Sequence, residues 1–255
     1  MEYMPAVFIG HGSPMNAIEK NRFTDNWRKL ADEIPRPEAI LSVSAHWYTK
    51  GTRITDEKQP KTIYDMYGFP KKLYEIEYKA PGAPELAHYT RGLISKEVSI
   101  DNSWGYDHGT WSVLHVMYPD ADIPVYQMSV DRSADAGVHF EIGRQIRELR
   151  KKGVMILGSG NVVHNLSRIN WEMESGYAWA QDFDEYIKDS ILSRQYQNAV
   201  EYEKAGKSSE LAFQIPDHFY PLLYVLGAAS DGDRISVLND DYVLGSLSMT
   251  CYIFS

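Results

Sequence analysis

Four of the eight histidines in this chain lie in short runs rich in small residues, and three of those runs directly follow a strand-like apolar segment. The four runs are GHGSP around His11, VSAHW around His46, GSGNVVHN around His164 and PDHFYP around His218. Backbone of this kind bends readily, so the rings can be brought to a shared point. Neutral imidazole is the commonest protein ligand for zinc, iron, copper and nickel. One buried histidine is usually satisfied by a backbone carbonyl, whereas three in matching contexts predict a metal site.

The segment WGYDHGTW, residues 104–111, carries a further histidine of interest. Asp107 is predicted to cap a helix over residues 109–118, which leaves His108 at the positive end of that helix with its ring free to face a pocket. The alternative is a capping loop packed by Trp104 and Trp111. Three other histidines lie within amphipathic patterns and are expected to be structural or at the surface, namely His88, His115 and His139.

Length and composition indicate one folded domain over residues 1–255. Hydrophobic residues at 44% and charged residues at 24% are ordinary for a globular protein. The net charge of −9 argues against a nucleic-acid partner, which would require clustered lysine and arginine. Cys251 is the only cysteine, so a reducing cytoplasm is expected. The apolar run at residues 6–9 is too short for a secretory signal or a membrane-spanning helix, and we expect no membrane partner.

Apolar runs and helical patterns alternate along the chain. Four short runs rich in β-branched residues are predicted to be strands buried on both faces, at residues 6–9, 39–43, 123–130 and 154–157. Helical periodicity predicts helices over residues 23–34, 84–95, 133–152 and 182–204, the third of them ending at Gly153. From Gly245 onward, apolar and polar residues alternate, which predicts a terminal strand in which one face is less apolar than the other.

This order of elements predicts an α/β single domain with a mostly parallel central sheet covered by helices on both faces. Such sheets bind ligands beyond the carboxyl ends of their strands, and we expect the metal site there. His11 and His46 are expected to follow their strands directly, and His164 to follow its strand through a sharp turn at the glycines of GSG. His218 precedes a predicted helix with Pro221 in its first turn, so it can complete the site from beyond the strand ends.

Five motifs occur in an order that is typical of one family: GHGSP, SAHW, DHGTW, SGNVVHN and PDHFYPLLYVLG. In these motifs the chain resembles the class III extradiol ring-cleavage dioxygenases, specifically the branch of the DOPA 4,5-dioxygenases. The resemblance covers nearly the whole chain, from about Met4 to the terminal strand. It implies an enzyme that inserts both atoms of O2 into a catechol-type, DOPA-like substrate at a mononuclear non-haem metal.

The resemblance also implies roles for the histidines. His11 and His46 would be metal ligands, and His218 stands where other branches place a glutamate. His164 would be the active-site base, or a fourth ligand in substrate-free protein. His108 would be a donor that stabilises negative charge on oxygen. Fe(II) is expected for activity, while an all-histidine site also suits Zn(2+), which is expected to occupy it in purified protein.

The substrate is expected to contact the loop YDMYGFP, residues 64–70, whose aromatic rings and glycine suit a fold over a flat ligand. The residues expected to bind substrate are Tyr64, Asp65, Phe69 and Ser13. The alternative is an aromatic surface loop that packs on the core. The expected partners are a small aromatic diol and O2, and the protein is expected to be a monomer or a small homo-oligomer.

Two other classes of function use the same residues. In a zinc hydrolase the histidines would hold a metal-bound water, with His164, His108, Asp107 or Asp217 as the base. In a non-enzymatic protein of the same fold, the site would bind a metal or a peptide. Turnover of metal-replete protein separates these possibilities.

Overall fold

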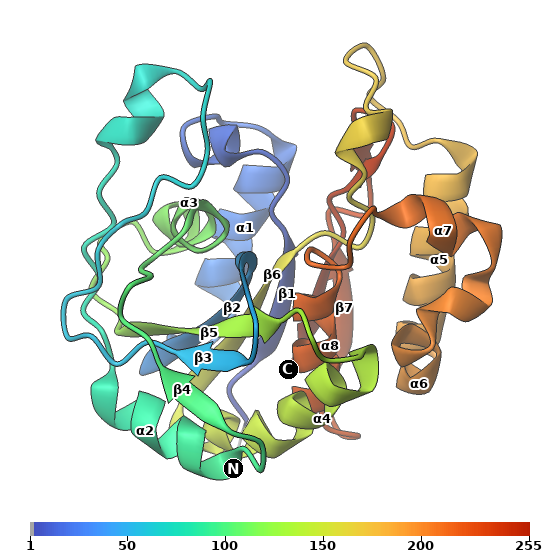
Figure 1. Cartoon of the computed structure of the whole chain (residues 1–255). Coiled ribbons are helices and arrows are strands. Elements are labelled where there is room, and N and C mark those ends of the chain that lie inside the picture. Colours follow the sequence, from blue (N-terminus) through green and yellow to red (C-terminus); the bar gives the residue numbers. More distant parts are fainter. Residues whose placement is uncertain (1–2) are drawn as a thin grey trace.

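Eight strands form the main sheet of the computed structural model, which describes residues 3–255 (Figure 1). Their order across the sheet is β4 (Val98–Ile100), β3 (Thr52–Ile54), β5 (Val125–Asp131), β2 (Ala39–Thr49), β6 (Val154–Gly160), β1 (Ala6–Gly10), β10 (Cys251–Phe254) and β7 (Ile235–Leu238). The central strands β5, β2, β6 and β1 are parallel to one another. β10 runs antiparallel to both β1 and β7, and β3 runs antiparallel to β5. The predicted α/β fold with a mostly parallel centre is confirmed.

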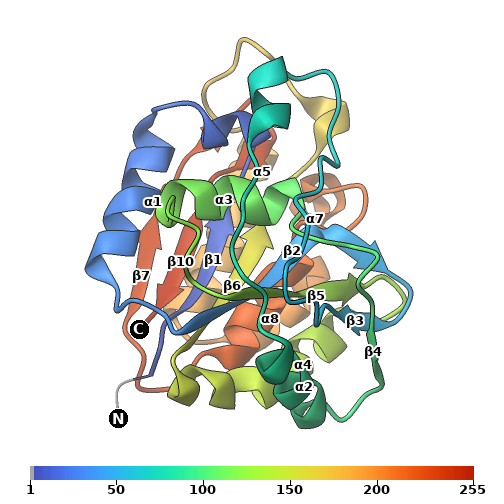
Figure 2. The ribbon, with the colours of Figure 1, turned by 90° about the vertical axis from the view of Figure 1, so that its left-hand side faces the viewer.

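Alternate side chains of β1 enter two different cores, one on each face of the sheet. Ala6 and Phe8 belong to one buried cluster, whereas Val7 and Ile9 belong to the other. Helices α1 (Arg22–Glu33) and α3 (His108–Met117) cover the face of Val7 and Ile9, as Figure 2 shows. The opposite face is covered by α2 (Pro84–Leu93), α4 (Ala136–Ile146), α5 (Ala178–Leu192) and α8 (Tyr220–Ala228). This two-sided burial explains why the central strands read as continuous apolar runs.

The single helix predicted over residues 182–204 is wrong. The structure has α5 up to Leu192, then α6 (Tyr196–Val200) and the 3-10 turn η5 (Tyr202–Ala205), followed by α7 (Lys207–Ala212). Arg194 has a positive φ of 59°, a left-handed conformation that a continuing helix does not contain. The helix predicted over residues 133–152 is α4 followed by the 3-10 helix η3 (Arg147–Lys152), and it ends at Gly153 as predicted, with a φ of 74°.

The terminal segment also differs from its prediction. Its alternating residues divide between β9 (Leu247–Ser248), which pairs with β8 (Tyr242–Val243) in a separate small sheet, and β10 in the main sheet. All four residues of β10 are buried, because β10 lies between β1 and β7 and not at an exposed edge. Alternation of residue types therefore did not reveal how completely this strand is covered.

The carboxyl ends of β2, β6 and β1 lie side by side, because these strands are consecutive in the sheet. Short 3-10 turns follow at or near this end, namely η1 (Pro14–Ala17), η2 (Lys71–Glu75) and η4 (Leu166–Arg168). Among residues 3–255, no helix combines the length and the apolar character needed to cross a membrane.

Candidate metal centre

His11 directly follows the last residue of β1, and its ring is buried. Its backbone N–H donates to the carbonyl of Gly160 over 3.0 Å, which continues the pairing of β1 with β6 for one more residue. Its ring Nδ1 lies 2.9 Å from Ser159 Oγ, and that hydroxyl donates its own proton to the carbonyl of Gly109 over 2.6 Å. Ser159 Oγ must therefore accept from the Nδ1–H of His11, which leaves Nε2 without a proton.

His46 lies inside β2 and not after it, so its predicted position is wrong by several residues. The strand continues to Thr49, but its register against β5 shifts between Ser44 and Tyr48. Such an irregularity bends a strand and redirects its side chains. It places the ring of His46 with Nε2 only 3.2 Å from Nε2 of His11, so the irregularity in β2 carries His46 toward the end of β1.

His218 reaches the same place from the segment before α8. Its backbone carbonyl accepts from the N–H of Asn161 over 2.9 Å, just beyond the end of β6. A Cβ on Gly160 would lie 2.0 Å from that carbonyl oxygen, so only glycine permits this approach. The expected sharp turn at the GSG glycines is wrong: Gly158 and Gly160 lie within β6, and their role is to let the start of α8 and His218 pack closely. Pro221 is in the first turn of α8, as predicted.

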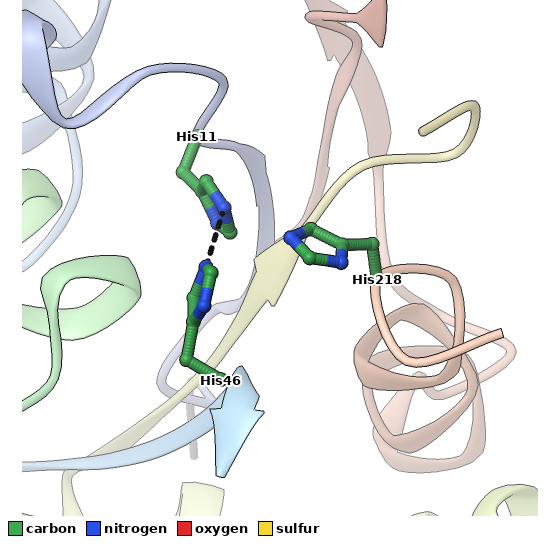
Figure 3. A group of neighbouring side chains, drawn as sticks. All are labelled: His11, His46 and His218. Carbon is green, nitrogen blue, oxygen red and sulfur yellow. Dashed lines mark hydrogen bonds between the residues drawn. The ribbon is translucent and has the colours of Figure 1, made fainter. Parts of the chain in front are cut away.

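The rings of His11, His46 and His218 form a group in which one nitrogen of each lies within 4.8 Å of the others. Figure 3 shows the three rings pointing toward one another, with the far nitrogen of His218 directed at the other two. The Nδ1 of His218 bonds to Asp217 Oδ1 over 2.9 Å, so its Nε2 is the nitrogen that faces the group.

The arrangement fits a bound cation. Nδ1 of His11 donates to Ser159, so its Nε2 carries a lone pair. That lone pair lies 3.2 Å from Nε2 of His46, a separation that either a shared proton or a bound cation can bridge. Two nitrogens bound to one metal at about 2.0–2.1 Å are about 2.8–3.4 Å apart for octahedral to tetrahedral angles. Three neutral imidazoles are also a donor set that zinc and iron accept.

Burial keeps the rings of His11 and His46 neutral. It holds the pKa of His11 well below its ordinary value of 6.5, with the neighbouring ring of His218 as the next cause. The pKa of His46 is lowered in the same way, by burial first and by His108 second. A protonated imidazole cannot bind a metal, so both groups are in the state that a metal needs at neutral pH.

His164 lies beside this group but outside it. Its ring is stacked on that of His218, with centroids 3.5 Å apart and only 4° between the planes. The ring nitrogens that lie within 4.8 Å of one another belong to His11, His46 and His218, and none of them is from His164. His164 therefore lies next to this group of three, and its expected role as a fourth ligand in substrate-free protein stays a prediction. Burial, and then His218, lowers the pKa of His164 well below 6.5, so its ring is free to accept a proton.

His108 is the first residue of α3, and Asp107 is its N-cap, as predicted: Asp107 Oδ1 accepts from the N–H of Thr110. Trp104 Nε1 donates to the other oxygen of Asp107, so the tryptophan-packed capping loop also exists. The His108 ring itself bonds to Asp65 and lies with its centroid 3.8 Å from that of His46, so the expectation that this ring faces a pocket stays a prediction. Asp107 itself is buried and also accepts from Ser44, which leaves it bonded throughout and unsuited to act as a hydrolytic base.

The four residues expected to bind substrate have contacts within the protein. The Tyr64 hydroxyl donates to the carbonyl of Ile76, and its ring packs against Trp111. Phe69 is partly buried against one of the two cores. Ser13 Oγ accepts from the N–H of Met15 at the start of η1. The fourth, Asp65, bonds to His108.

Sequence reasoning missed Ser159, which sets the protonation of His11. A signal was present in the strand itself. Gly158 and Gly160 face α8, and because successive residues of a strand point to opposite faces, Ser159 must point the other way, toward α3 and His11.

Comparisons with known proteins agree on one family. Residues 4–254 match the family described as the catalytic LigB subunit of aromatic ring-opening dioxygenase. A protein of Escherichia coli (strain K12) named 4,5-DOPA dioxygenase extradiol is 46% identical, over 96% of this chain and 93% of that protein. A Beta vulgaris protein of the same name is 36% identical, over 97% of this chain and 95% of that protein. The crystal structure of an uncharacterized protein from Escherichia coli K12 superimposes with a TM-score of 0.86 at 42% identity, covering 99% of this chain and all of that one (100%).

Proposed function

Because this chain belongs to the LigB family of aromatic ring-opening dioxygenases, and so opens aromatic rings with O2, we propose that His11, His46 and His218 hold the metal ion at which it does so. The observation that carries the proposal is the state of the three rings. Each has its Nδ1 turned to an acceptor of the protein, so that three Nε2 atoms meet at one point. Acceptors of this kind fix the tautomer and orientation of metal-bound histidines.

The substrate we propose is a catechol, with DOPA as the first compound to test. The named relatives support this choice, since the proteins of Escherichia coli and Beta vulgaris are both called 4,5-DOPA dioxygenase extradiol. Tyr64 and Phe69, on the loop of residues 64–70, and Ser13 beside His11 are the contacts we propose for its ring and side chain. The metal, when bound, supplies positive charge that makes the phenol protons more acidic and, if it is iron, the electrons that O2 activation requires.

His164 is the base in this proposal. It is neutral, and it lies against His218, so its ring can take a phenol proton from a diol held at the three histidines. The same ring can return that proton to oxygen when the bond between the two oxygen atoms breaks. Overall one O2 adds to one catechol, the ring bond beside the diol breaks, and the product carries one new aldehyde and one new carboxylate.

His108 is the donor to the oxygen side in this proposal, as an imidazolium whose Nδ1–H faces Asp65 and whose Nε2–H is left to meet oxygen. Its position at the first turn of α3 adds the partial positive charge of a helix start, and its ring lies next to His46. Negative charge that develops on oxygen near His46 would be stabilised there.

Reconstitution under anaerobic conditions tests the proposal. Protein loaded with Fe(II) should consume one O2 per catechol and yield a yellow semialdehyde, followed with an oxygen electrode and by absorbance. Zinc-loaded protein should bind its metal and do neither, because zinc has no accessible redox change. If iron-loaded protein takes up no O2 with DOPA or any other catechol, while metal binding is intact, the proposed substrate class is wrong.

We also propose that the protein works in the cytoplasm. The only cysteine, Cys251, is buried in β10, and burial raises the pKa of its thiol to about 11. A thiol in that state forms no disulfide and reacts slowly with oxidants, which supports a protein that does not depend on an oxidising compartment.

A further inference from the structure

Asp65 is bonded to one histidine and in contact with a second. It lies in the loop between β3 and η2, and only 11% of its side chain is exposed. One carboxylate oxygen accepts from the backbone N–H of His108 over 2.8 Å. The other lies 3.0 Å from Nδ1 of His108 and 3.3 Å from Nδ1 of His46. A single side chain therefore meets two rings and the first N–H of helix α3.

These contacts determine which nitrogen of each ring carries a proton. A carboxylate offers only acceptors, so Nδ1 of His108, which bonds to it over 3.0 Å, must carry a proton, and the contact of 3.3 Å favours a proton on Nδ1 of His46 as well. The Nε2 of His46 is then free for a metal, and it is this atom that lies 3.2 Å from Nε2 of His11. In the same way, the contact with Nδ1 holds the His108 ring beside that of His46.

Asp65 differs in this respect from the acceptors of the other two clustered histidines. Ser159 accepts a hydrogen bond from the ring of His11 alone, and Asp217 accepts one from the ring of His218 alone. Only for Asp65 does one carboxylate oxygen approach two rings of the site, one in the metal-holding group and one outside it. Its bond to the N–H of His108 also ties the loop of residues 64–70 to the start of α3.

We propose that Asp65 is a positioning residue, which fixes the tautomer of His46 and the orientation of His108 together, and that it does not bind the substrate. This revises the expectation from the sequence, where Asp65 was a substrate contact. The inference rests on the proposed role of His46 as a metal ligand. Neither oxygen is free to meet a diol, because both are within bonding distance of protein N–H groups.

The test compares Asp65→Asn with Ser159→Ala, in which a one-ring acceptor is lost. Metal affinity is measured by competition of Co(II) or Zn(II) with a chromophoric chelator. Both variants should bind metal about 10–100-fold more weakly than wild type, the usual effect of removing such an acceptor. At saturating Fe(II), Asp65→Asn should still show a lowered kcat, because His108 is misplaced, whereas Ser159→Ala should recover most of its kcat.

A double-mutant cycle with His108→Ala separates the two actions of Asp65. In the His108→Ala background, Asp65→Asn should still weaken metal binding but should slow kcat little further, since the ring that it orients is gone. Asp65→Glu keeps the carboxylate and should restore metal affinity to within a few-fold of wild type. If circular dichroism shows that Asp65→Asn does not fold, the same measurements of metal affinity and kcat are made on Asp65→Glu instead.

Three results would overturn the inference. Unchanged metal affinity together with a raised KM in Asp65→Asn would make Asp65 a substrate contact. An equal fall in kcat with and without His108 would remove the link to that ring. A second equivalent of metal in wild type that Asp65→Asn loses would mean that His46, Asp65 and His108 bind a cation of their own. Failure of the proposed function looks different: wild type itself would bind no metal, or would bind it and open no ring.

Discussion

The side chains of the candidate site depend on their immediate neighbours for their chemical state. His11, His46 and His218 turn their Nε2 atoms toward one another because their Nδ1 atoms face Ser159, Asp65 and Asp217 respectively. His164 lies next to that group and stacks on His218. Residues of one type are thus separated into two roles by their hydrogen bonds and by ring orientation.

Alanine at His11, His46 or His218 is expected to abolish stoichiometric metal binding, because two imidazoles remain where three converge. Metal content after reconstitution and desalting, measured by mass spectrometry, checks this. His88→Ala is the matched control, since that ring is 57% exposed and paired with Asp56 away from the group. It should keep one equivalent. If all three site variants also kept one equivalent, the ligands would lie elsewhere.

His164→Ala is expected to keep its metal and to lose turnover by roughly the 10²–10⁴-fold that general acid–base catalysis contributes. The reason is that its ring lies outside the metal-holding group but against His218. His108→Ala should lose less, and catechol affinity measured anaerobically should change little. If His108→Ala weakened catechol binding as much as it slowed ring opening, His108 would not be a donor to the oxygen side.

Two irregular features of the strands bring these residues together. The register shift in β2 between Ser44 and Tyr48 carries His46 toward His11, and the glycines of β6 let the segment of His218 pack against the sheet. Neither feature is needed for the sheet to form. Both are needed for three rings from three separate segments to meet at its carboxyl end.

Gly160→Ala tests the second feature. The new Cβ would lie 2.0 Å from the carbonyl oxygen of His218, so that backbone must move. We expect a loss of stability of about 1–3 kcal/mol, as for other overpacked sites, together with weakened metal binding. Urea unfolding and chelator competition measure the two effects.

Gly92→Ala is the control for that substitution. Gly92 lies in α2 with no atom within 4 Å of the added Cβ, and alanine in a helix interior is favoured over glycine by about 0.5–1 kcal/mol. It should leave metal binding unchanged and should not destabilise the protein. Intact metal binding in Gly160→Ala would mean that His218 can be held in place without this close contact.

For the molecule as a whole, stability depends on histidines that are buried in the neutral form. His139 is one of them: it is a residue of α4, is outside the group of site histidines, and packs its ring against Tyr220 at the start of α8. Its Nδ1 bonds to the Tyr224 hydroxyl over 2.9 Å, and its Nε2 has no hydrogen-bond partner in the part of the chain that the structure describes. Burial lowers its pKa to about 4.

The lowered pKa of His139 makes the free energy of unfolding depend on pH, and it also sets the sign of that dependence. Because the pKa is lower in the folded than in the unfolded protein, the unfolded state takes up the proton first. The contribution of His139 is therefore complete above about pH 6.5 and is lost as the pH falls toward 4, by up to about 3 kcal/mol. His11, His46 and His164 act in the same direction, so the metal-free protein should be labile in acid.

His139→Gln is expected to make the free energy of unfolding less dependent on pH, because unfolding of the variant takes up about one proton fewer. Urea unfolding of metal-free wild type and variant between pH 8 and pH 4 measures it. At pH 8 the difference between them reports only lost packing, and it should shrink as the pH falls. A difference that stays constant over that range would show that the pKa of His139 is not lowered in the folded protein.

The sequence by itself determined the α/β fold, the helix cap at Asp107 and the histidines that gather at the strand ends. These depend on local patterns: apolar runs, capping residues and histidines in fixed order along the chain. The partners that the ring nitrogens face, the stacking of His164 on His218 and the contacts of Asp65 were decided only by the tertiary structure. The physical reason is separation along the chain, since His11 bonds to a residue 148 positions away and His108 to one 43 positions away. No local pattern encodes such partners, because they are set by the register of parallel strands and by the path of the loop that carries Asp65.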